Sequence, residues 1–331
     1  MGTHMPTAFV TGATGFLGRH LIDVLLEENW SITAMVRDLD AASKILSSKV
    51  QLVAGDLTRP ETMRKAMPEK VDCVFHTAAD TSTWSKEAAR QRKINVDGTA
   101  ALLQLVLDKE AGRMVHVSTT SVFGEHHGPV TEQTPRLGAR SWVSYVRTKA
   151  YAERKVKEAV ERGLSATIVN PTHILGRYDS HNWARLILML ADGSLPGTPP
   201  GGGNFANARA VAEAILAAYH KGKDGENYIL GGPQASFYEF LEIASEKISR
   251  DKPKKPMAPL VLKAVSRIAT FVSLFTGKRP MLTPEEANFS CEILDARSDK
   301  AVKELDYKIV PLEQSVDEYI EYLKETKLLQ L

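Results

Sequence analysis

Short runs of β-branched and apolar residues alternate with longer helical segments through the first half of the chain, and this alternation constrains the fold most. Between the runs, segments such as 16–28, 95–110 and 145–162 carry apolar residues at helical spacing. The pattern predicts an α/β fold with a parallel sheet that is buried on both faces and covered by helices. The predicted strands are residues 7–12, 31–37, 50–56, 71–79, 113–119 and 165–171.

The regular alternation ends after Pro171, and glycine and proline cluster at residues 193–204. A helix at 208–222 and a strand at 226–232 then return to the α/β pattern. We therefore expect two parts, with the first five residues, MGTHM, read as an expression remnant. The sheet domain is expected to comprise residues 6–172 and about 205–232, and a smaller, mostly helical lobe about 173–204 and 233–331.

A glycine-rich turn, TGATGFLG, connects the first predicted strand to the first predicted helix. Gly12 allows the tight turn, Gly15 lets the backbone approach a pyrophosphate, and Gly18 lets the helix pack against the strand. The helix N-terminus that follows offers free N–H donors and partial positive charge to phosphates. This context predicts a dinucleotide site that also includes Thr14, Phe16 and Leu17.

The end of the second strand bears on which dinucleotide is bound. Arg37 can pair with a ribose 2′-phosphate, which favours NADP, and Arg19 is expected to add a second positive group. Asp38 keeps NAD open, because a carboxylate there can accept the ribose hydroxyls. A solvated strand-end residue is the other interpretation of Arg37. Further positions predicted beside the cofactor are Asp56, Leu57, Thr77, Ala78 and Ala79.

Several motifs in order resemble the extended short-chain dehydrogenase/reductases: TGATGFLG, GDL, HTAA, NVDGT, VSTTSVFG, YVRTK and NPTHILG. Within that family the chain is most similar to the branch of dihydroflavonol-reductase-like, 3β-hydroxysteroid-dehydrogenase-like and hopanoid-associated epimerase-like proteins. The resemblance implies a Rossmann fold with a C-terminal substrate lobe and an NAD(P)-dependent oxidoreductase. It also implies cofactor contacts from Asn95, Pro171 and Ile174, although a structural role for Asn95 remains an alternative.

Tyr145 and Lys149 lie one helical turn apart in YVRTK and are the predicted catalytic pair. A tyrosine with its ordinary pKa of about 10 exchanges protons poorly at neutral pH, so we expect the Lys149 ammonium to lower the pKa of the phenol. Thr119 matches the position at which the family places a hydroxyl for the substrate oxygen, with Ser118 or Thr120 as alternatives. Hydride transfer from NADPH to a carbonyl carbon, with Tyr145 as proton donor, is the predicted reaction.

The expected substrate is a hydrophobic small molecule. Tryptophans such as Trp84 and the apolar segment at 260–275 suggest it, and His173 is a further substrate-contact candidate. That segment is expected to be a core or subdomain helix, with a pocket wall or membrane-surface contact as alternatives. Residues 201–208 contain no basic side chain to hold a nucleotide-sugar diphosphate, which favours a reductase over an epimerase or dehydratase. A non-catalytic NADP sensor is a third hypothesis.

Composition narrows the remaining classes. The formal charge is +2 from 42 basic and 40 acidic residues that are well mixed, which argues against a nucleic-acid partner. Cys73 and Cys291 form neither a disulfide framework nor a zinc motif, and we predict no metal site. A cytoplasmic protein without stable membrane insertion is expected, and a homodimer is a further expectation from the resemblance.

Overall fold

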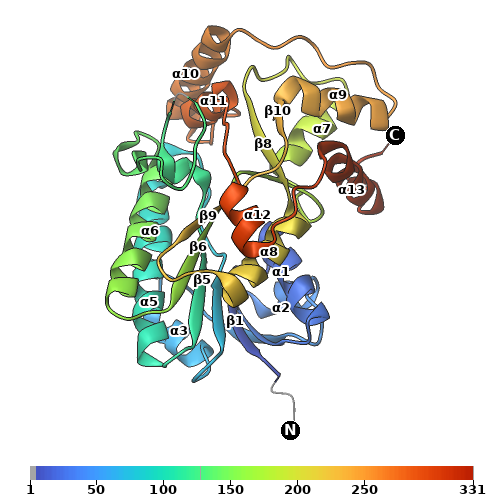
Figure 1. Ribbon diagram of the computed structural model, residues 1–331. Coiled ribbons are helices and arrows are strands. Elements are labelled where there is room, and N and C mark those ends of the chain that lie inside the picture. The colour runs from blue at the N-terminus through green and yellow to red at the C-terminus, as the bar shows by residue number, and fades with distance from the viewer. Residues whose placement is uncertain (1–4, 127, 331) are drawn as a thin grey trace.

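The computed structural model describes residues 5–126 and 128–330. Its centre is a seven-stranded parallel sheet in the order β3-β2-β1-β4-β5-β6-β9, as predicted for a Rossmann fold (Figure 1). The strands are β1 Thr7–Thr11, β2 Ser31–Val36, β3 Gln51–Ala54, β4 Cys73–His76, β5 Arg113–Val117, β6 Ala166–Pro171 and β9 Asn227–Leu230. Each lies within its predicted run.

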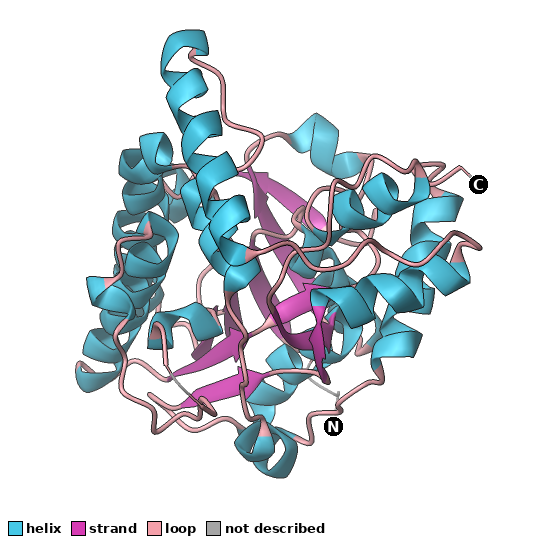
Figure 2. Cartoon of the chain, turned by 90° about the horizontal axis from the view of Figure 1, so that it is seen from above, coloured by secondary structure: helices cyan, strands magenta, loops and turns pink. Residues whose placement is uncertain are grey.

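Helices cover both faces of this sheet (Figures 1 and 2). On one face α1 packs against α8, and their apolar residues form a core with β1 and β2. On the other face α3, α5 and α6 form a second core. Burial on both faces explains why the strands read as continuous apolar runs. These helices are α1 Phe16–Glu27, α2 Leu39–Ser43, α3 Pro60–Ala66, α4 Ala88–Gln91, α5 Thr99–Asp108, α6 Ser144–Glu161 and α8 Ala208–Lys221.

The strand order reverses between β1 and β4, and this reversal positions the site. Connections leave β1 and β4 toward opposite sides of the sheet, which opens a crevice at their carboxyl ends. There, Thr77 N donates to Thr11 O at 3.1 Å, so the loop after β4 is held beside the glycine turn after β1.

A smaller lobe lies beyond the carboxyl ends of the strands. Its sheet has the order β10-β8-β7, with β10 antiparallel and β7 parallel to β8, and a separate core gathers around α7, α9 and α13. Residues 205–207, which we predicted with the sheet domain, belong to β8. The elements are β7 His173–Leu175, α7 Trp183–Ala191, β8 Gly202–Asn207, β10 Gln234–Ser236, α9 Phe237–Lys247, α10 Pro259–Thr276, α11 Pro284–Cys291 and α13 Leu312–Glu325. Helix α12 Asp299–Leu305 instead packs on α8 and β9, with Ala301 and Leu305 in the core of the large sheet.

Helix α10 corresponds to the apolar segment that was expected to be a core or subdomain helix. It lies beside α11 at the outer edge of the lobe (Figure 1), and only Leu262, Ser266 and Ser273 are buried. The helix is therefore not a core helix but part of the smaller lobe, as the subdomain interpretation has it. Leu262 and Ala269 also line the large cavity described below.

Candidate active site

The glycine turn has the geometry that a dinucleotide site needs. Gly12 has φ +80°, a region that favours glycine, and a Cβ there would lie 2.6 Å from Ala78 N. A Cβ on Gly18 would lie 2.0 Å from Gly12 O, so α1 approaches the turn as closely as only glycine permits. Gly15 caps α1 without a side-chain hydrogen bond, which leaves first-turn N–H groups available to a phosphate.

A cavity of about 2420 Å³ runs from the glycine turn into the smaller lobe. Because ligand pockets usually measure about 300–1,000 Å³, this volume has room for a dinucleotide and a second molecule. Nearly all predicted cofactor residues line it. They are Gly12, Thr14, Gly15, Phe16, Leu17, Gly18, Arg37, Asp56, Leu57, Thr77, Ala78, Ala79, Tyr145, Lys149, Pro171 and Ile174.

Arg37 is exposed at the rim of this cavity, immediately after β2. Asp38, the residue that kept NAD open, caps α2 instead: its Oδ1 accepts from Ala41 N at 2.9 Å. The Asp38 carboxylate thus caps α2, whereas Arg37 lines the cavity. Asp56, across the rim, has its pKa lowered, and although burial opposes this, hydrogen bonds from Thr58 outweigh it.

Arg19 does not support Arg37 as the sequence suggested. Its guanidinium carbon stacks 3.7 Å from the ring centroid of Tyr178, and Arg19 does not line the cavity. The cation–π contact turns the side chain toward the smaller lobe. The expectation of a second positive group at the ribose is therefore wrong.

Tyr145 lies in the first turn of α6, and Thr119 follows β5, so the two reach the cavity from neighbouring elements. The Thr119 hydroxyl is a hydrogen-bond partner of the Tyr145 phenol and also donates to Ser121 Oγ at 3.3 Å. The two alternative hydroxyls are engaged elsewhere. Ser118 Oγ donates to Glu153, and Thr120 Oγ1 donates to the backbone of Pro171.

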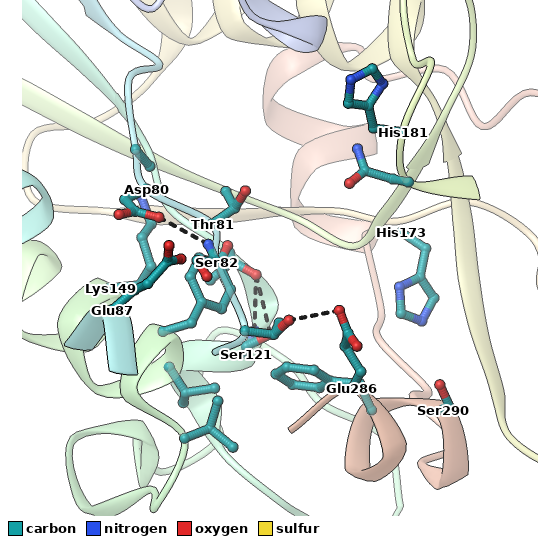
Figure 3. Close-up of a pocket in the computed structure, with 18 of the residues that line it drawn as sticks. Asp80, Thr81, Ser82, Glu87, Ser121, Lys149, His173, His181, Glu286 and Ser290 are labelled. Atoms are coloured by element: carbon teal, nitrogen blue, oxygen red, sulfur yellow. Dashed lines mark hydrogen bonds between the residues drawn. The ribbon is translucent and has the colours of Figure 1, made fainter. Parts of the chain in front are cut away.

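Lys149 is buried one turn after Tyr145, and its Nζ donates to Val117 O at 2.7 Å. Burial lowers the pKa of Lys149 to about 8, and the charge of Glu153 opposes this shift. The β5 carbonyl therefore fixes the amine at the floor of the cavity, where Figure 3 shows it.

The pKa of the Tyr145 phenol is shifted in the direction opposite to the prediction. Burial raises the pKa of the phenol, and only the Thr119 hydrogen bond opposes this. The prediction that Lys149 lowers the phenol pKa is wrong for the chain alone, since the amine is directed to Val117 O. The phenol is consequently protonated at neutral pH, the state that a proton donor requires.

Glu153 was not recognised from the sequence. It is buried below Lys149 and accepts three hydrogen bonds: from Ser118 Oγ at 2.9 Å, Asn170 Nδ2 at 3.0 Å and Arg136 Nε at 2.8 Å. Its position four residues after Lys149, on the same face of α6, was the available signal. The network ties α6 to β5 and β6 directly beneath the Tyr145–Lys149 pair.

Asn95 does not line the cavity, contrary to its predicted cofactor contact. It lies in a π-helical segment at Arg92–Gly98, is buried, and donates to Asp80 O at 2.9 Å and Thr148 Oγ1 at 3.1 Å. Its Oδ1 also accepts from Asp80 N at 2.7 Å. The structural alternative for Asn95 is the one that these contacts favour: it positions the loop after β4 against α6.

Trp84 does not line the cavity either. The half-buried ring packs under Lys86, whose Nζ lies 5.3 Å from the ring centroid. Its neighbour Thr83 faces the cavity instead and donates to Glu286 Oε1 at 3.0 Å. The predicted substrate contact of Trp84 is therefore wrong by one position.

His173 does line the cavity, on the side facing Lys149 (Figure 3). Its ring packs 5.0 Å from Trp183, 5.5 Å from Phe205 and 5.9 Å from Phe237. Burial lowers the pKa of His173 to about 4, so the imidazole is neutral at physiological pH. It offers a substrate an aromatic edge and a hydrogen-bonding group without charge.

The wall of the cavity in the smaller lobe is mainly apolar. Its polar groups are largely paired with one another: Arg279 Nη2 donates to Glu286 Oε1 at 2.8 Å and to Thr83 Oγ1 at 2.9 Å. This bridge joins α11 to the loop after β4. It could not be predicted from the local sequence. The apolar lining includes Trp142, Leu186, Met189, Phe237, Met257, Leu262, Val265, Ala269 and Phe289.

No group of three or more histidine, cysteine, aspartate or glutamate side chains within residues 5–126 and 128–330 is placed to hold a metal ion. His126 and His181 therefore belong to no metal set, and His127 lies outside the described residues.

The fold, the glycine turn and the Tyr–Lys pair together define an NAD(P)-dependent enzyme of the short-chain dehydrogenase/reductase type. The chain belongs to the NAD-dependent epimerase/dehydratase family, whose model matches residues 8–231.

Two relatives and one solved structure illustrate the range of the similarity. The chain is 30% identical over 263 residues to "Sterol demethylase protein B" of Methylococcus capsulatus, covering 78% of this chain and 80% of that protein. It is 34% identical over 245 residues to the "4-hydroxy-2-methyl-3-oxo-4-farnesyl-3,4-dihydroquinoline-1-oxide ketoreductase" of Stigmatella aurantiaca, and the match covers 72% of each chain. The crystal structure of gox2253 is 28% identical, with a TM-score of 0.81 over 98% of this chain and 99% of that one.

Proposed function

We propose that this enzyme reduces a ketone or aldehyde group of a hydrophobic small molecule to an alcohol with NADPH. The observation that carries the proposal is the joint position of Tyr145, Thr119 and Lys149. They meet at the point where the dinucleotide part of the cavity passes into its apolar part.

Tyr145 and Thr119 have different roles in proton transfer. The phenol of Tyr145, kept protonated by burial, donates its proton to the substrate oxygen as negative charge develops there. Thr119 donates a second hydrogen bond to the same oxygen and orients it. Bound NADPH supplies the hydride.

Lys149 completes the arrangement from below. Its amine donates to Val117 O at 2.7 Å, one helical turn after Tyr145, and from this position it would hold the nicotinamide ribose beside the phenol. The Glu153 network holds α6 in the register that this requires.

The proposed preference for NADPH rests on the different interactions of the Arg37 and Asp38 side chains. Arg37 forms no ion pair with the described residues and stands at the rim, whereas Asp38 is engaged as a helix cap. A guanidinium pairs well with a 2′-phosphate, and NAD lacks that group.

The apolar character of the substrate follows from the lobe that would hold it. The stretch 201–208 becomes the buried strand β8, and the next basic residue, Arg209, is paired with Glu27 and with Glu213 outside the cavity. The β8 segment thus offers no free cation to a sugar diphosphate, although Arg185, which donates to Met281 O, and Lys278 line other parts of the cavity. Both relatives carry names that point to apolar molecules: a sterol and a farnesylated ring.

A screen of aliphatic, aromatic and polycyclic ketones and aldehydes tests the proposal. NADPH oxidation with an apolar carbonyl, accompanied by stoichiometric alcohol, is the expected result. The rival epimerase or dehydratase predicts a different one: NAD(P) retained through purification, no net NADPH consumption, and turnover of a nucleotide sugar.

A further inference from the structure

The outward face of α10 carries large apolar side chains that residues 5–126 and 128–330 leave exposed. Leu260 is 79% exposed, Phe275 78%, Ile268 65%, and Phe271 and Leu274 61% each. A single exposed apolar side chain is ordinary, but a contiguous group of this size marks an interaction surface. We call these five residues the docking face.

Exposed basic residues lie on this helix and on the segments next to it, although Lys252 pairs with Glu242 and Arg279 with Glu286. The segment from residue 252 to residue 284 contains no aspartate or glutamate, and all its basic residues are exposed. Lys263 and Arg267 lie three and seven residues after Leu260, so they share the outward side of the helix with it. The basic residues are Lys252, Lys254, Lys255, Lys263, Arg267, Lys278 and Arg279.

The opposite face of α10 lines the cavity through Leu262, Val265, Ala269 and Val272. A single helix thus separates the apolar part of the cavity from the apolar surface outside. Any apolar medium that covers the docking face lies one helix diameter from the proposed substrate site.

Helix α10 has the length and composition of a membrane span, with 18 residues and a mean hydropathy of 1.4. Its place in the fold argues for lying on a membrane instead. One side packs on α11 and lines the cavity, Ser266 and Ser273 are buried in that side, and Lys263 and Arg267 interrupt the other. A basic, aromatic and amphipathic helix of this kind binds in the interface plane.

We propose that the docking face binds the surface of an anionic lipid bilayer and inserts its aromatic and aliphatic side chains below the headgroups. The long stems of Lys263 and Arg267 let their charged ends reach lipid phosphates while the stems stay in the apolar layer. Delivery of a bilayer-dissolved substrate to the cavity would follow, and that consequence alone rests on the proposed function.

The charges favour a bilayer over a second copy of the chain. A two-fold pairing of docking faces would bring Lys263 and Arg267 of both copies into one interface, and the segment 252–284 contains no carboxylate to neutralise them. Like charges brought together oppose association, whereas an anionic surface attracts each of them.

Co-sedimentation with vesicles tests the proposal. One set of vesicles is phosphatidylcholine with phosphatidylglycerol, and the other is phosphatidylcholine alone. We expect binding to the first that weakens as salt is raised, and much weaker binding to the second. The double variant Lys263→Glu/Arg267→Glu should lower the partition coefficient by at least about tenfold, because each basic residue near such a surface contributes about a factor of five.

Three further variants separate docking from misfolding. Phe271→Ser/Phe275→Ser removes apolar contact and should reduce binding similarly, whereas the exposed-site controls Ile309→Ser and Lys49→Glu, away from α10, should bind as the wild type does. Far-UV circular dichroism and thermal midpoints report whether each variant is folded. Because the readout is lipid binding, its result is independent of carbonyl reduction.

Three outcomes would overturn the proposal. The first is no binding of folded wild type to anionic vesicles at low salt. The second is equal loss of binding in the Ile309→Ser or Lys49→Glu controls. The third is a dimer in analytical ultracentrifugation that Phe271→Ser/Phe275→Ser abolishes while vesicle binding is absent, which would assign the face to a second copy.

Discussion

Replacing Arg37 with glutamine should convert a preference for NADPH into near equality of the two cofactors. The guanidinium stands exposed at the rim and has no ion pair among the described residues, so its loss leaves no partner charge stranded. NADH lacks the 2′-phosphate that Arg37 would contact, and its affinity should change little.

The magnitude follows from the kind of contact and its exposure. Hydrogen bonds to charged groups contribute about 1.5–3 kcal/mol, and solvent screening at an exposed rim favours the lower end of that range. About 1.5 kcal/mol corresponds to roughly tenfold in the dissociation constant. Raising the salt concentration should weaken NADPH binding less in the variant than in the wild type, because the variant makes one ionic contact fewer.

Fluorescence titration of NADPH and NADH against both proteins measures this directly. The matched control is Arg59→Gln, since Arg59 is also exposed and lies 3.8 Å from Asp56, yet does not line the cavity. Weakening of NADPH and NADH by the same factor, or an unchanged NADPH affinity, would refute the assignment of Arg37 to the 2′-phosphate.

Three other substitutions test the site's supports. Gly18→Ala places a Cβ 2.0 Å from Gly12 O, so urea denaturation should show a loss of about 1–3 kcal/mol together with lost NADPH binding; wild-type behaviour would contradict the turn geometry. Burial lowers the Lys149 pKa from 10.5 to about 8. Between these pH values the unfolded chain binds more protons than the folded chain, so the free energy of unfolding rises with pH. The difference in unfolding free energy between wild type and Lys149→Met should therefore increase across that range, by at most about 1.4 kcal/mol per pH unit, and a constant difference would be inconsistent with a buried amine. Glu153→Ala should cost about 3 kcal/mol because buried donors lose their acceptor, while the exposed Glu158→Ala on the same helix should cost under about 1 kcal/mol, and similar losses would argue against the network.

The sheet could be predicted from the sequence because its strands are buried on both faces. Strands such as β2 and β6 are buried at nearly every position, and their runs of small and β-branched residues show this without knowledge of which distant elements cover them. The glycine turn could also be predicted, since its backbone requirements are local.

Predictions from the neighbouring sequence were least reliable where a side chain had two possible partners. Asp38 was considered as an alternative ribose ligand at a strand end, but the helix-forming LDAAS that follows makes it an N-cap. Asn95 was placed in a regular helix, whereas the π-helical segment at 92–98 buries it against the loop after β4. The capping signal was present in the sequence, while the π segment depends on packing against α6.

The smaller lobe could be predicted least. Its cavity joins residues nearly two hundred positions apart, as in the contact of Thr83 with Arg279 and Glu286. The apolar periodicity of α10 gave the two faces of the helix but not which face the protein covers. Contacts over such separations are set by tertiary packing, which a single sequence does not display.

The most direct test of the account is a comparison of wild type with Tyr145→Phe under single-turnover conditions with NADPH and a carbonyl substrate from the screen. The variant keeps the ring and removes only the hydroxyl that contacts Thr119. We predict unchanged NADPH affinity and a loss of hydride transfer of at least about a hundredfold, as for other general acids. Hydride transfer at the wild-type rate in a folded, NADPH-binding variant would contradict Tyr145 as the proton donor.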